Sequence, residues 1–427
     1  MGYRLVDVDV TRPFPELPID DGSGGLGVLL RDGRRPLGFL LIARPDPASR
    51  PEWTPQAAAA AAPGLLTERL RRMLLERSDS AGGVASAEPP TPPPAVTVAI
   101  CTRNRPDDLA ECLRSVLATG GTRPAEVLVV DNCPPDDRTR EMVSRLDGVR
   151  YVREPVAGLD MARNRALEEA RGEWIAFVDD DVRVDRWWLD GWAGALQEHP
   201  DAAAVTGLVL PAQLQTEAQV RFERRGGFGR GYEQRRWDGR RGPGDRLHPL
   251  GAGVFGAGCN MAFDVAVLRS LGGFDEALDT GPPLPGGGDL DAFYRVLDAG
   301  HVLVYQPEMA VFHRHRHAMD ELRRQYWSWG TGFAAYLGAR WADPAERAQV
   351  LRMIAWWMRH QRRQVVAGVR SHDRDDVRMA LAELFGGVTG LPFGYARSRR
   401  RMALRRAVAA AQQTPTSAQK DVGGLAT

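Results

Sequence analysis

Between Val96 and Asp181, four apolar runs alternate with segments of helical periodicity, and this alternation permits few folds. The apolar runs are VTVAIC, EVLVVD, VRYVRE and EWIAFVD, each with the length and residue types of a buried strand. After the first run, one helical face is formed by Leu109, Cys112, Leu113, Val116 and Leu117. Strands and helices that alternate with short connections predict an α/β fold with a right-handed, doubly wound and mostly parallel sheet.

The composition changes on either side of this pattern, and we divide the chain into five parts. They are a small N-terminal α+β module of unknown role, a Pro/Ala/Ser linker, the α/β domain, a helical region rich in Arg and Trp, and a disordered tail, at residues 1–78, 79–95, 96–317, 318–410 and 411–427. Within the α/β domain, residues 201–250 break the alternation, and they include the Gly- and Arg-rich stretch RFERRGGFGRGYEQRRWDGRRGPGD. We expect this stretch to be a long loop or a flexible insertion.

The composition excludes several classes of protein. With 43% hydrophobic and 26% charged residues, the chain is typical of globular proteins rather than disordered or fibrous ones. A net charge of +1 gives no argument for a nucleic-acid partner. Four cysteines without C-x-x-C spacing argue against disulfides or a zinc site and predict a reducing, cytoplasmic compartment. We expect neither a signal peptide nor a spanning helix, because the first residues include acids and no apolar run is long enough.

Three consecutive acids, Asp179, Asp180 and Asp181, follow the fourth apolar run. In open α/β sheets, ligands bind outside the carboxyl ends of the strands, so these side chains are candidates for a binding site. Like charges so close together are costly without a positive partner, and a divalent cation with oxygen ligands supplies one. Because side chains alternate in extended backbone, Asp179 and Asp181 are expected to point the same way. A solvated acidic loop is the alternative.

A second acidic pair, Asp289 and Asp291, follows the glycine-rich stretch TGPPLPGGG. A carboxylate at the junction between such a loop and a helix is well placed to act as a general base. The alternative is that one of the two acids caps the helix N-terminus. A second glycine-rich stretch, GAGVFGAG at 251–258, lacks the preceding strand of a dinucleotide-binding loop. We expect it to line the substrate instead.

Three histidines alternate in VFHRHRH, at His313, His315 and His317. If this stretch is a strand, all three face one side, where a metal ligand could lie. A lone histidine is more often structural, so a structural role is the alternative. The alternating set favours the interpretation as a ligand.

The order of these motifs resembles that of the family 2 glycosyltransferases, which have the glycosyltransferase A fold. The matching pieces are VTVAICTRNRPDDLAECLRSVL, VVDN, GLDMARNRALEEARGEWIAFVDDD, GAGCNMAFDVAVLRSLGGFDEAL and GGGDLDAFYRVLDAGHVLVYQPEMAVFHRHR, which span about half the chain. The resemblance implies a hexosyltransferase-type enzyme, EC 2.4, of glycan or cell-envelope biosynthesis. It would transfer a sugar from a nucleotide-diphosphate-sugar donor to an acceptor hydroxyl with inversion of the anomeric carbon.

The resemblance also implies roles for individual residues. The donor nucleotide would be bound by Thr102, Arg105, Asp131, Arg163, Asn164 and Asp180. The metal ion, Mg²⁺ or Mn²⁺, would be held by Asp179, Asp181 and His313. Asp289 matches the catalytic aspartate of the family's E-D motif, as the general base. The Glu that precedes this aspartate in the family is replaced here by Gly288, which removes any acceptor contact made by that Glu.

Aromatic and acidic residues indicate where an acceptor could bind. Trp187, Trp188 and Trp192 follow the three acids, and we expect helical packing of these rings, with sugar stacking as the alternative. Asp291 and, in QYWSWGTGFAAY, Trp327 are the candidates for acceptor contacts, with plain packing as the alternative for Trp327. The sequence leaves open whether the acceptor is a glycan, a lipid-linked molecule or a small molecule.

The C-terminal region is strongly basic. Residues 352–406 contain 13 arginines and 4 acids, interspersed with Trp and Met. This composition fits peripheral contact of residues 345–406 with an anionic membrane, here the inner face of the cell membrane. The alternative is a soluble helical cap whose arginines are solvated.

Other functions fit parts of the sequence. The string DDDVRV resembles the nucleophile motif of haloacid dehalogenase phosphatases, but these also need a downstream lysine, and the only lysine is Lys420 in the expected tail. A sugar-nucleotide pyrophosphorylase would carry a G-x-x-x-R loop where CTRNRPDD has no glycine. A non-catalytic nucleotide-sugar-binding protein is the third alternative, and the acids Asp179, Asp181 and Asp289 argue against it.

Overall fold

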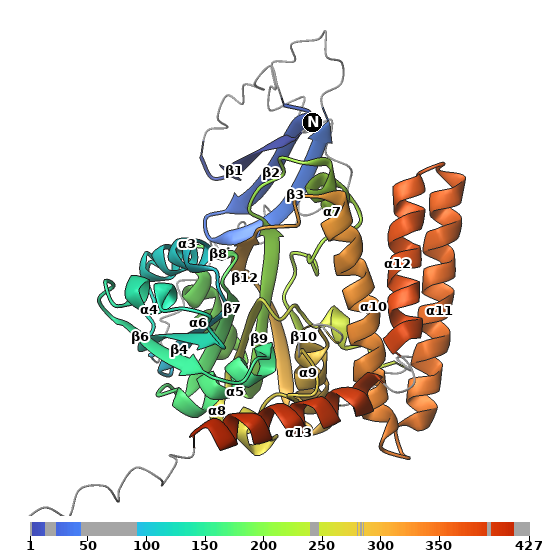
Figure 1. Ribbon diagram of the computed structural model, residues 1–427. Coiled ribbons are helices and arrows are strands. Elements are labelled where there is room, and N and C mark those ends of the chain that lie inside the picture. Colours follow the sequence, from blue (N-terminus) through green and yellow to red (C-terminus); the bar gives the residue numbers. More distant parts are fainter. Residues whose placement is uncertain are drawn as a thin grey trace, which may run out of the picture.

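The computed structural model contains a central β-sheet with helices on both of its faces (Figure 1). The structure describes residues 2–12, 23–43, 92–239, 247–279, 281, 284, 286–390 and 394–413. Strands and helices alternate through the first half of the sheet, as the sequence predicts. The predicted α/β fold class is therefore confirmed.

Four neighbouring parallel strands form one half of the sheet. They are β4 (Val96–Thr102), β5 (Glu126–Asn132), β6 (Val149–Glu154) and β7 (Trp174–Asp179), in the order β7-β4-β5-β6. The helices between them are α3 (Pro106–Leu117), α4 (Arg138–Val143) and α5 (Leu159–Glu169). Crossovers of this kind place the carboxyl ends of all four strands at one edge. That edge carries Thr102, Asn132 and Asp179.

The other half of the sheet mixes strand directions. It contains β8 (Val182–Val184), β9 (Ala202–Pro211), β10 (Arg235–Trp237), β11 (Asn260–Asp264) and β12 (Val302–His313). The order across the whole sheet is β10-β12-β9-β11-β7-β4-β5-β6, and β11 is antiparallel to both of its neighbours. β8 pairs with the end of β12, which sets His313 opposite Val182. Asp181, one residue before Val182, is thereby brought close to His313.

The Gly- and Arg-rich stretch that was predicted to be a long loop contains the end of a helix and a short strand, so the prediction was wrong for these parts. The helix is α7 (Glu217–Arg224), and the strand is β10. Before them, β9 is buried along its whole length, and its apolar run AAAVTGLVLP carries the signal of a strand buried on both faces.

Two layers of buried side chains hold the helices to the sheet. On one face, Val98 of β4 packs with α3 and with Trp188 and Trp192 of α6 (Trp188–Glu198). On the other face, Phe263 of β11 packs with α5, α8 (Val265–Ser270) and α9 (Gly288–Asp298). Trp188 and Trp192 are fully buried, as expected for helical packing. Burying one large apolar side chain stabilises a fold by about 1.5–3 kcal/mol.

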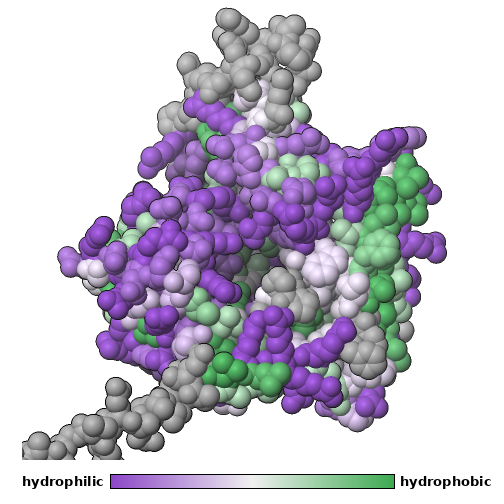
Figure 2. Space-filling model, viewed as in Figure 1, coloured by the Kyte–Doolittle hydropathy of each residue, from purple (hydrophilic) through white to green (hydrophobic). Residues whose placement is uncertain are grey.

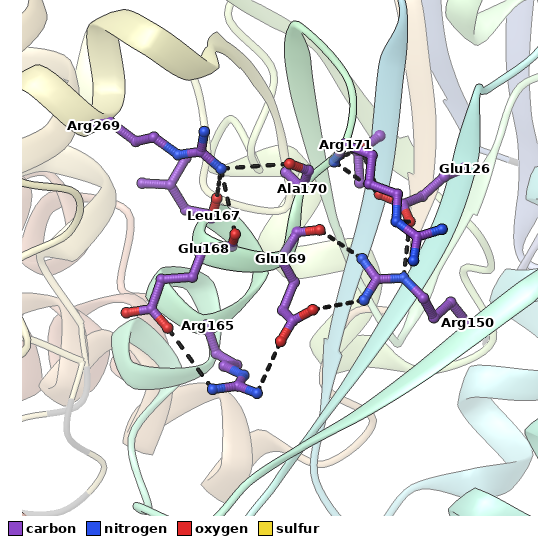
Figure 3. Close-up of polar contacts among 10 residues, drawn as sticks. Glu126, Arg150, Arg165, Leu167, Glu168, Glu169, Ala170, Arg171 and Arg269 are labelled. Carbon is purple, nitrogen blue, oxygen red and sulfur yellow. Dashed lines mark hydrogen bonds and ion pairs between the residues drawn. The ribbon is translucent and has the colours of Figure 1, made fainter.

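Charged side chains fasten the C-terminal end of α5 to the sheet (Figure 3). Arg150 donates hydrogen bonds to Glu126 at 2.9 Å and to Glu169 at 2.7 Å. Arg269 donates to carbonyl oxygens of the last turn, of which that of Leu167 is nearest at 2.6 Å. Cations at a helix C-terminus satisfy the free carbonyl groups and interact favourably with the helix dipole. With this end fixed, the first turn of α5 is held at the strand ends.

A separate three-stranded sheet lies at the N-terminus. Its strands are β1 (Tyr3–Asp9), β2 (Gly25–Asp32) and β3 (Arg35–Ala43), with β1 parallel and β3 antiparallel to β2. Arg31 of β2 reaches the main domain, where its guanidinium is 3.0 Å from the carboxylate of the buried Asp185. The helix expected within residues 1–78, and most of the expected linker 79–95, fall outside the described residues.

Four helices follow the sheet, as predicted for the C-terminal region. They are α10 (Met319–Trp341), α11 (Arg347–Arg370), α12 (Arg374–Gly390) and α13 (Gly394–Gln413). α10, α11 and α12 stand side by side, and α13 runs along the lower edge of the molecule (Figure 1). α13 extends three residues into 411–427, where a disordered tail was expected, and the rest of that tail falls outside the described residues. Among the described helices, none is long and apolar enough to cross a bilayer.

α10 and α12 pack closely because glycines lie at their contact. A Cβ atom at Gly330 would lie 1.9 Å from the carbonyl oxygen of Glu383, and one at Gly386 would lie 2.0 Å from that of Trp327. Neither position has room for a side chain, so the two backbones meet directly. The glycines thus set the distance between the two helices.

Candidate active site

A large cavity, with a volume of about 1410 Å³, opens at the carboxyl ends of β4 and β7. The space-filling view shows a hollow between the sheet and the C-terminal helices (Figure 2). One wall carries Thr102, Arg105 and residues 179–181, and residues 256–258 and Asp289 also line the cavity. The C-terminal helices add four aromatic side chains, Trp329, Phe333, Trp356 and Trp357. Residues far apart in the sequence therefore line one space.

Asp179, Asp181 and His313 form a compact group on the strand-end wall. One ligand atom from each residue lies within 4.8 Å of the others. The His313 Nε2 atom is 3.3 Å from Asp181 Oδ1. Asp180 points elsewhere and accepts a hydrogen bond from the Thr102 hydroxyl at 2.8 Å. The alternation of side chains in extended backbone accounts for this arrangement.

The electrostatics of this wall are dominated by buried carboxyl groups. Burial raises the pKa of Asp179 to about 7 and the pKa of Asp180 to about 6. Arg105, 3.1 Å from Asp180, offsets part of the negative charge. Burial lowers the pKa of His313 to about 4, so its imidazole is neutral at neutral pH and has a nitrogen lone pair to offer.

The donor set suits a divalent cation. Two carboxylates with one neutral imidazole are ligand types found around Mn²⁺ and, when water completes the shell, around Mg²⁺. The pairing of β8 with β12 already brings the three side chains together. A cation here would also relieve the repulsion between Asp179 and Asp181.

The histidines of VFHRHRH do not alternate along one strand, so the expectation that all three share a face was wrong. β12 ends at His313, and His317 is exposed beyond it. His315 is buried beside His313, with the two Nδ1 atoms 3.2 Å apart. The Nε2 atom of His315 lies 2.6 Å from Oε1 of Glu223 on α7.

Asp289 lies in the first turn of α9. Its Oδ2 atom accepts a hydrogen bond from the Gly258 backbone N–H at 2.9 Å. Asp289 thereby holds the end of the glycine-rich stretch 251–258, whose residues other than Ala252 line the cavity. The N-cap position of α9 is occupied by Gly287, so neither Asp289 nor Asp291 is the N-cap residue of this helix.

Comparison with known proteins identifies the domain. Residues 97–271 match the family profile described as Glycosyl transferase family 2. The chain contains a family 2 glycosyltransferase domain. The pre-mycofactocin glycosyltransferase of Mycobacterium tuberculosis is 26% identical over 252 residues, 58% of this chain and 48% of that protein. The glucosyl-dolichyl phosphate glucuronosyltransferase of Haloferax volcanii is 29% identical over 120 residues, 27% of this chain and 38% of that protein. The matched part is less than half of each relative.

Solved structures show lower sequence identity to this chain. The mannosyltransferase PcManGT from Pyrobaculum calidifontis, in complex with GDP-Man and Mn²⁺, has a TM-score of 0.44 at 19% identity, covering 84% of this chain and 91% of that chain. S. aureus TarS 1-349, in complex with UDP-GlcNAc, has a TM-score of 0.39 at 15% identity, covering 67% of this chain and 90% of that chain.

In the family 2 domain, Arg163 lines the cavity and lies between two carboxylates. Its Nη1 atom is 3.0 Å from Asp160 Oδ1 and 3.3 Å from Asp279 Oδ2. Burial, together with the charge of Asp279, raises the pKa of Asp160 well above its ordinary value. Among the described residues, the Oδ2 atom of Asp160 has no hydrogen-bond partner. This oxygen faces α9.

Asp160 leaves no room for a side chain at position 288, where the resemblance implied a Glu. A Cβ atom at position 288 would lie 1.9 Å from Asp160 Oδ2, far inside contact distance. Asp160 therefore occupies the space that a side chain at position 288 would need. A carboxylate is present at this place, but it comes from α5 instead of α9.

We expect Gly288→Ala to lower the free energy of unfolding by about 1–3 kcal/mol, because the added methyl group meets a buried carboxylate. In an Asp160→Ala background, the same substitution should be less destabilising, since the clashing oxygen is gone. Urea unfolding of the parent, the two single variants and the double variant measures both values. Equal losses from Gly288→Ala in the two backgrounds would contradict the close contact.

Among the donor residues implied by the resemblance, the structure places Thr102, Arg105, Arg163 and Asp180 in the cavity and two others outside it. Asp131 is fully buried at the end of β5, where the Tyr151 hydroxyl donates to it at 3.0 Å, and its neighbour Asn132 lines the cavity. The Asn164 side chain accepts a hydrogen bond from the Phe274 backbone N–H at 2.7 Å and donates one to the Phe274 carbonyl oxygen at 2.9 Å. Asn164 thus holds a loop that packs on α5.

The two residues expected at the acceptor also lie outside the cavity lining. Asp291 is fully buried and pairs with Arg295 at 2.6 Å and with Arg340 at 3.1 Å, so it joins α9 to α10. Trp327 lies at the contact between α10 and α12. Trp329, two residues further along the helix, lines the cavity instead. Asp291 and Trp327 lie outside the lining because neighbouring helices cover the faces of α9 and α10 on which they lie.

Sequence reasoning missed several residues of the cavity. Asp279 lines it and bonds Arg163, but no motif or periodicity marks this residue. Phe228 and Arg230 also line it, from the segment that was predicted to be a loop. Their signal was available, because aromatic and arginine side chains alternate with glycine in RRGGFGRGY.

Proposed function

We propose that the chain is a metal-dependent glycosyltransferase that moves a sugar from a nucleotide-diphosphate-sugar donor to an acceptor hydroxyl with inversion. The observation that carries this proposal is that Asp179, Asp181 and His313 share one cavity with Asp289. A cation site and a carboxylate base in one cavity are the two groups that such a transfer needs.

At the donor end, Asp179, Asp181 and His313 would hold Mg²⁺ or Mn²⁺. When bound, the cation supplies positive charge for the departing diphosphate. Arg105 and Arg163 line the same end of the cavity and would add positive charge near the phosphate groups. Thr102 and Asp180, which bond each other at 2.8 Å, would frame the rest of the nucleotide.

In the same cavity, Asp289 would take the proton from the acceptor hydroxyl. The acceptor oxygen forms a bond to the anomeric carbon while the bond from that carbon to the diphosphate oxygen breaks. Attack from the face opposite the leaving group inverts the anomeric carbon. The hydrogen bond from Gly258 orients the carboxylate and leaves it lone pairs with which to accept the proton.

The aromatic end of the cavity would receive the acceptor. Trp329 and Phe333 of α10 and Trp356 of α11 supply ring faces there. Sugar rings and apolar chains both pack on aromatic rings, which suits an acceptor with either kind of group. We therefore place the acceptor between Asp289 and these two helices.

A donor screen tests the proposed function. Each of a set of UDP-, GDP- and dTDP-sugars is added to the full chain with Mn²⁺, and a donor bound by the folded state raises the melting temperature. Sugar transfer from the stabilising donor, measured by mass spectrometry, distinguishes an enzyme from a non-catalytic binding protein. Hydrolysis of a phosphoester without any acceptor would support the phosphatase alternative instead.

We also propose that the chain contacts an anionic membrane through the outer face of α11. This helix has six arginines and no acidic residue. Leu351, Met358 and Val369 on it are 55%, 45% and 60% exposed. Figure 2 shows apolar surface on this side of the molecule. Arginines interspersed with exposed apolar side chains are typical of helices that lie in a membrane interface.

We expect the full chain to float with liposomes that contain anionic lipid. With liposomes of zwitterionic lipid alone, we expect the chain to stay at the bottom of the gradient. Replacing Arg359, Arg362 and Arg363 by Gln should weaken binding roughly 100-fold, since each arginine near an anionic surface contributes about 1 kcal/mol. The matched control replaces Arg397, Arg399 and Arg400 of α13 by Gln. Equal losses in the two triple variants, or binding unchanged in high salt, would contradict the assignment to α11.

A further inference from the structure

A chain of hydrogen-bonding groups runs from the candidate cation site into the protein behind it. His313, whose Nε2 atom faces Asp181, has its Nδ1 atom 3.2 Å from Nδ1 of His315. The Nε2 atom of His315 is 2.6 Å from Oε1 of Glu223. The side chains of His315 and Glu223 are only 1% and 12% exposed, so this chain lies inside the protein.

We propose that Glu223 and His315 are positioning residues that fix the ring and the tautomer of His313 so that its Nε2 lone pair faces the cation. This inference rests on the proposed function, because it takes His313 as a ligand of a divalent cation. It adds two residues, from α7 and from the segment after β12, that do not touch the cation themselves.

The protons of the chain can be placed from its two ends. A ligating Nε2 atom carries no proton, so the proton of neutral His313 is on Nδ1 and is donated to Nδ1 of His315. His315 then carries its own proton on Nε2 and donates it to Glu223. With both rings neutral and Nε2 of His313 free of a proton, each bond in this arrangement has one donor and one acceptor. The carboxylate at the far end therefore selects the tautomer at the cation.

The surroundings hold both rings in place. The ring of Phe222 is 4.7 Å from that of His315, and the ring of Phe228 is 5.0 Å from that of His313. A Cβ atom at Gly227 would lie 2.5 Å from Glu223 Oε1, so the backbone closes directly over the carboxylate. These contacts come from α7 and the turn after it. The segment first expected to be a loop thus supports the candidate cation site.

The proposal predicts an effect on metal affinity. Removing a hydrogen-bond partner behind a metal-ligating histidine weakens metal binding by about 10–100-fold. We expect this loss in His315→Phe, which keeps an aromatic ring in the same aromatic surroundings. Glu223→Gln keeps an acceptor but removes the charge, so we expect a smaller loss in the same direction.

The first test is Mn²⁺ binding by the full chain, followed through the electron paramagnetic resonance signal of free Mn²⁺. His317→Phe and Glu217→Gln are the matched controls, because both residues are exposed and Glu217 is on the same helix as Glu223. Weaker binding in His315→Phe and Glu223→Gln, with both controls unchanged, supports the proposal. Binding equal to that of the parent chain in both variants overturns it and leaves the proposed function intact. A parent chain that binds no Mn²⁺ overturns both.

The second test reads the tautomer directly in the parent chain, and a variant serves only to assign the signals. Histidine-labelled chain is saturated with Mg²⁺, and long-range nitrogen–proton correlation spectra report which ring nitrogen of His313 carries the proton. His313→Asn identifies its signals. A proton on Nδ1 of His313 and on Nε2 of His315 supports the proposal, and a proton on Nε2 of His313 overturns it.

Discussion

The Asp289→Asn variant should lose about 10²–10⁴-fold in the rate of transfer while it binds the donor nearly as well as the parent chain. Asparagine cannot take a proton from an acceptor hydroxyl at neutral pH. Its carbonyl oxygen can still accept the hydrogen bond from Gly258 that Asp289 accepts at 2.9 Å, so the glycine-rich residues should keep their place. The expected loss therefore reports on proton transfer rather than on the shape of the cavity.

The measurement pairs a turnover assay with donor titration by calorimetry. Asp298→Asn is the matched control, because Asp298 is exposed at the other end of α9 and faces no part of the cavity lining. We expect parent-like turnover and affinity in this control. Losses of donor affinity and turnover by the same factor in Asp289→Asn would show that Asp289 binds the donor and is not the base.

Chelation by EDTA should reduce transfer to the background rate, and excess Mn²⁺ or Mg²⁺ should restore it. The expected loss is complete because a divalent cation held by Asp179, Asp181 and His313 would supply most of the positive charge that offsets the departing diphosphate. Turnover is measured after EDTA treatment, after its removal, and after each cation is added back. Full turnover in EDTA would rule out the proposed role of the cation.

A substitution tests whether the cation that transfer requires binds in the cavity. Asp181→Asn should raise the concentration of Mn²⁺ needed for half-maximal turnover, because one charged ligand is lost. Asp147→Asn, in an exposed turn before β6, is the control and should leave that concentration unchanged. If both variants need the same concentration of Mn²⁺ for half-maximal turnover, the cation binds elsewhere.

Periodicity predicted the elements of the fold well where local patterns decide them. The parallel half of the sheet follows from apolar runs and from the one-sided helix after β4, and both signals lie within a few residues of each other. The strand-end position of residues 179–181 follows from the same pattern. The antiparallel pairing of β11 does not, because it depends on a partner strand some eighty residues earlier in the chain.

The residues assigned wrongly share a physical reason. Asp291 was expected at the acceptor, but its partner Arg340 belongs to another helix, and no local pattern reveals which helices meet. Trp327 and Trp329 look alike in the sequence, yet they face different neighbours, because positions two residues apart on a helix point to nearly opposite sides. The resemblance implied which motifs hold the site, and only the packing of the helices shows which side chains reach it.

The glycines between α10 and α12 bear on how the breadth of accepted substrates could change. Trp329 and Phe333 belong to α10, whose backbone contacts that of α12 directly. A single methyl group added at position 330 or 386 would therefore push these two helices apart. Both rings would then shift together, with no alteration to any residue that meets the substrate. In such an architecture, substitution of the glycines between α10 and α12 could change selectivity without any change to the aromatic residues that line the cavity.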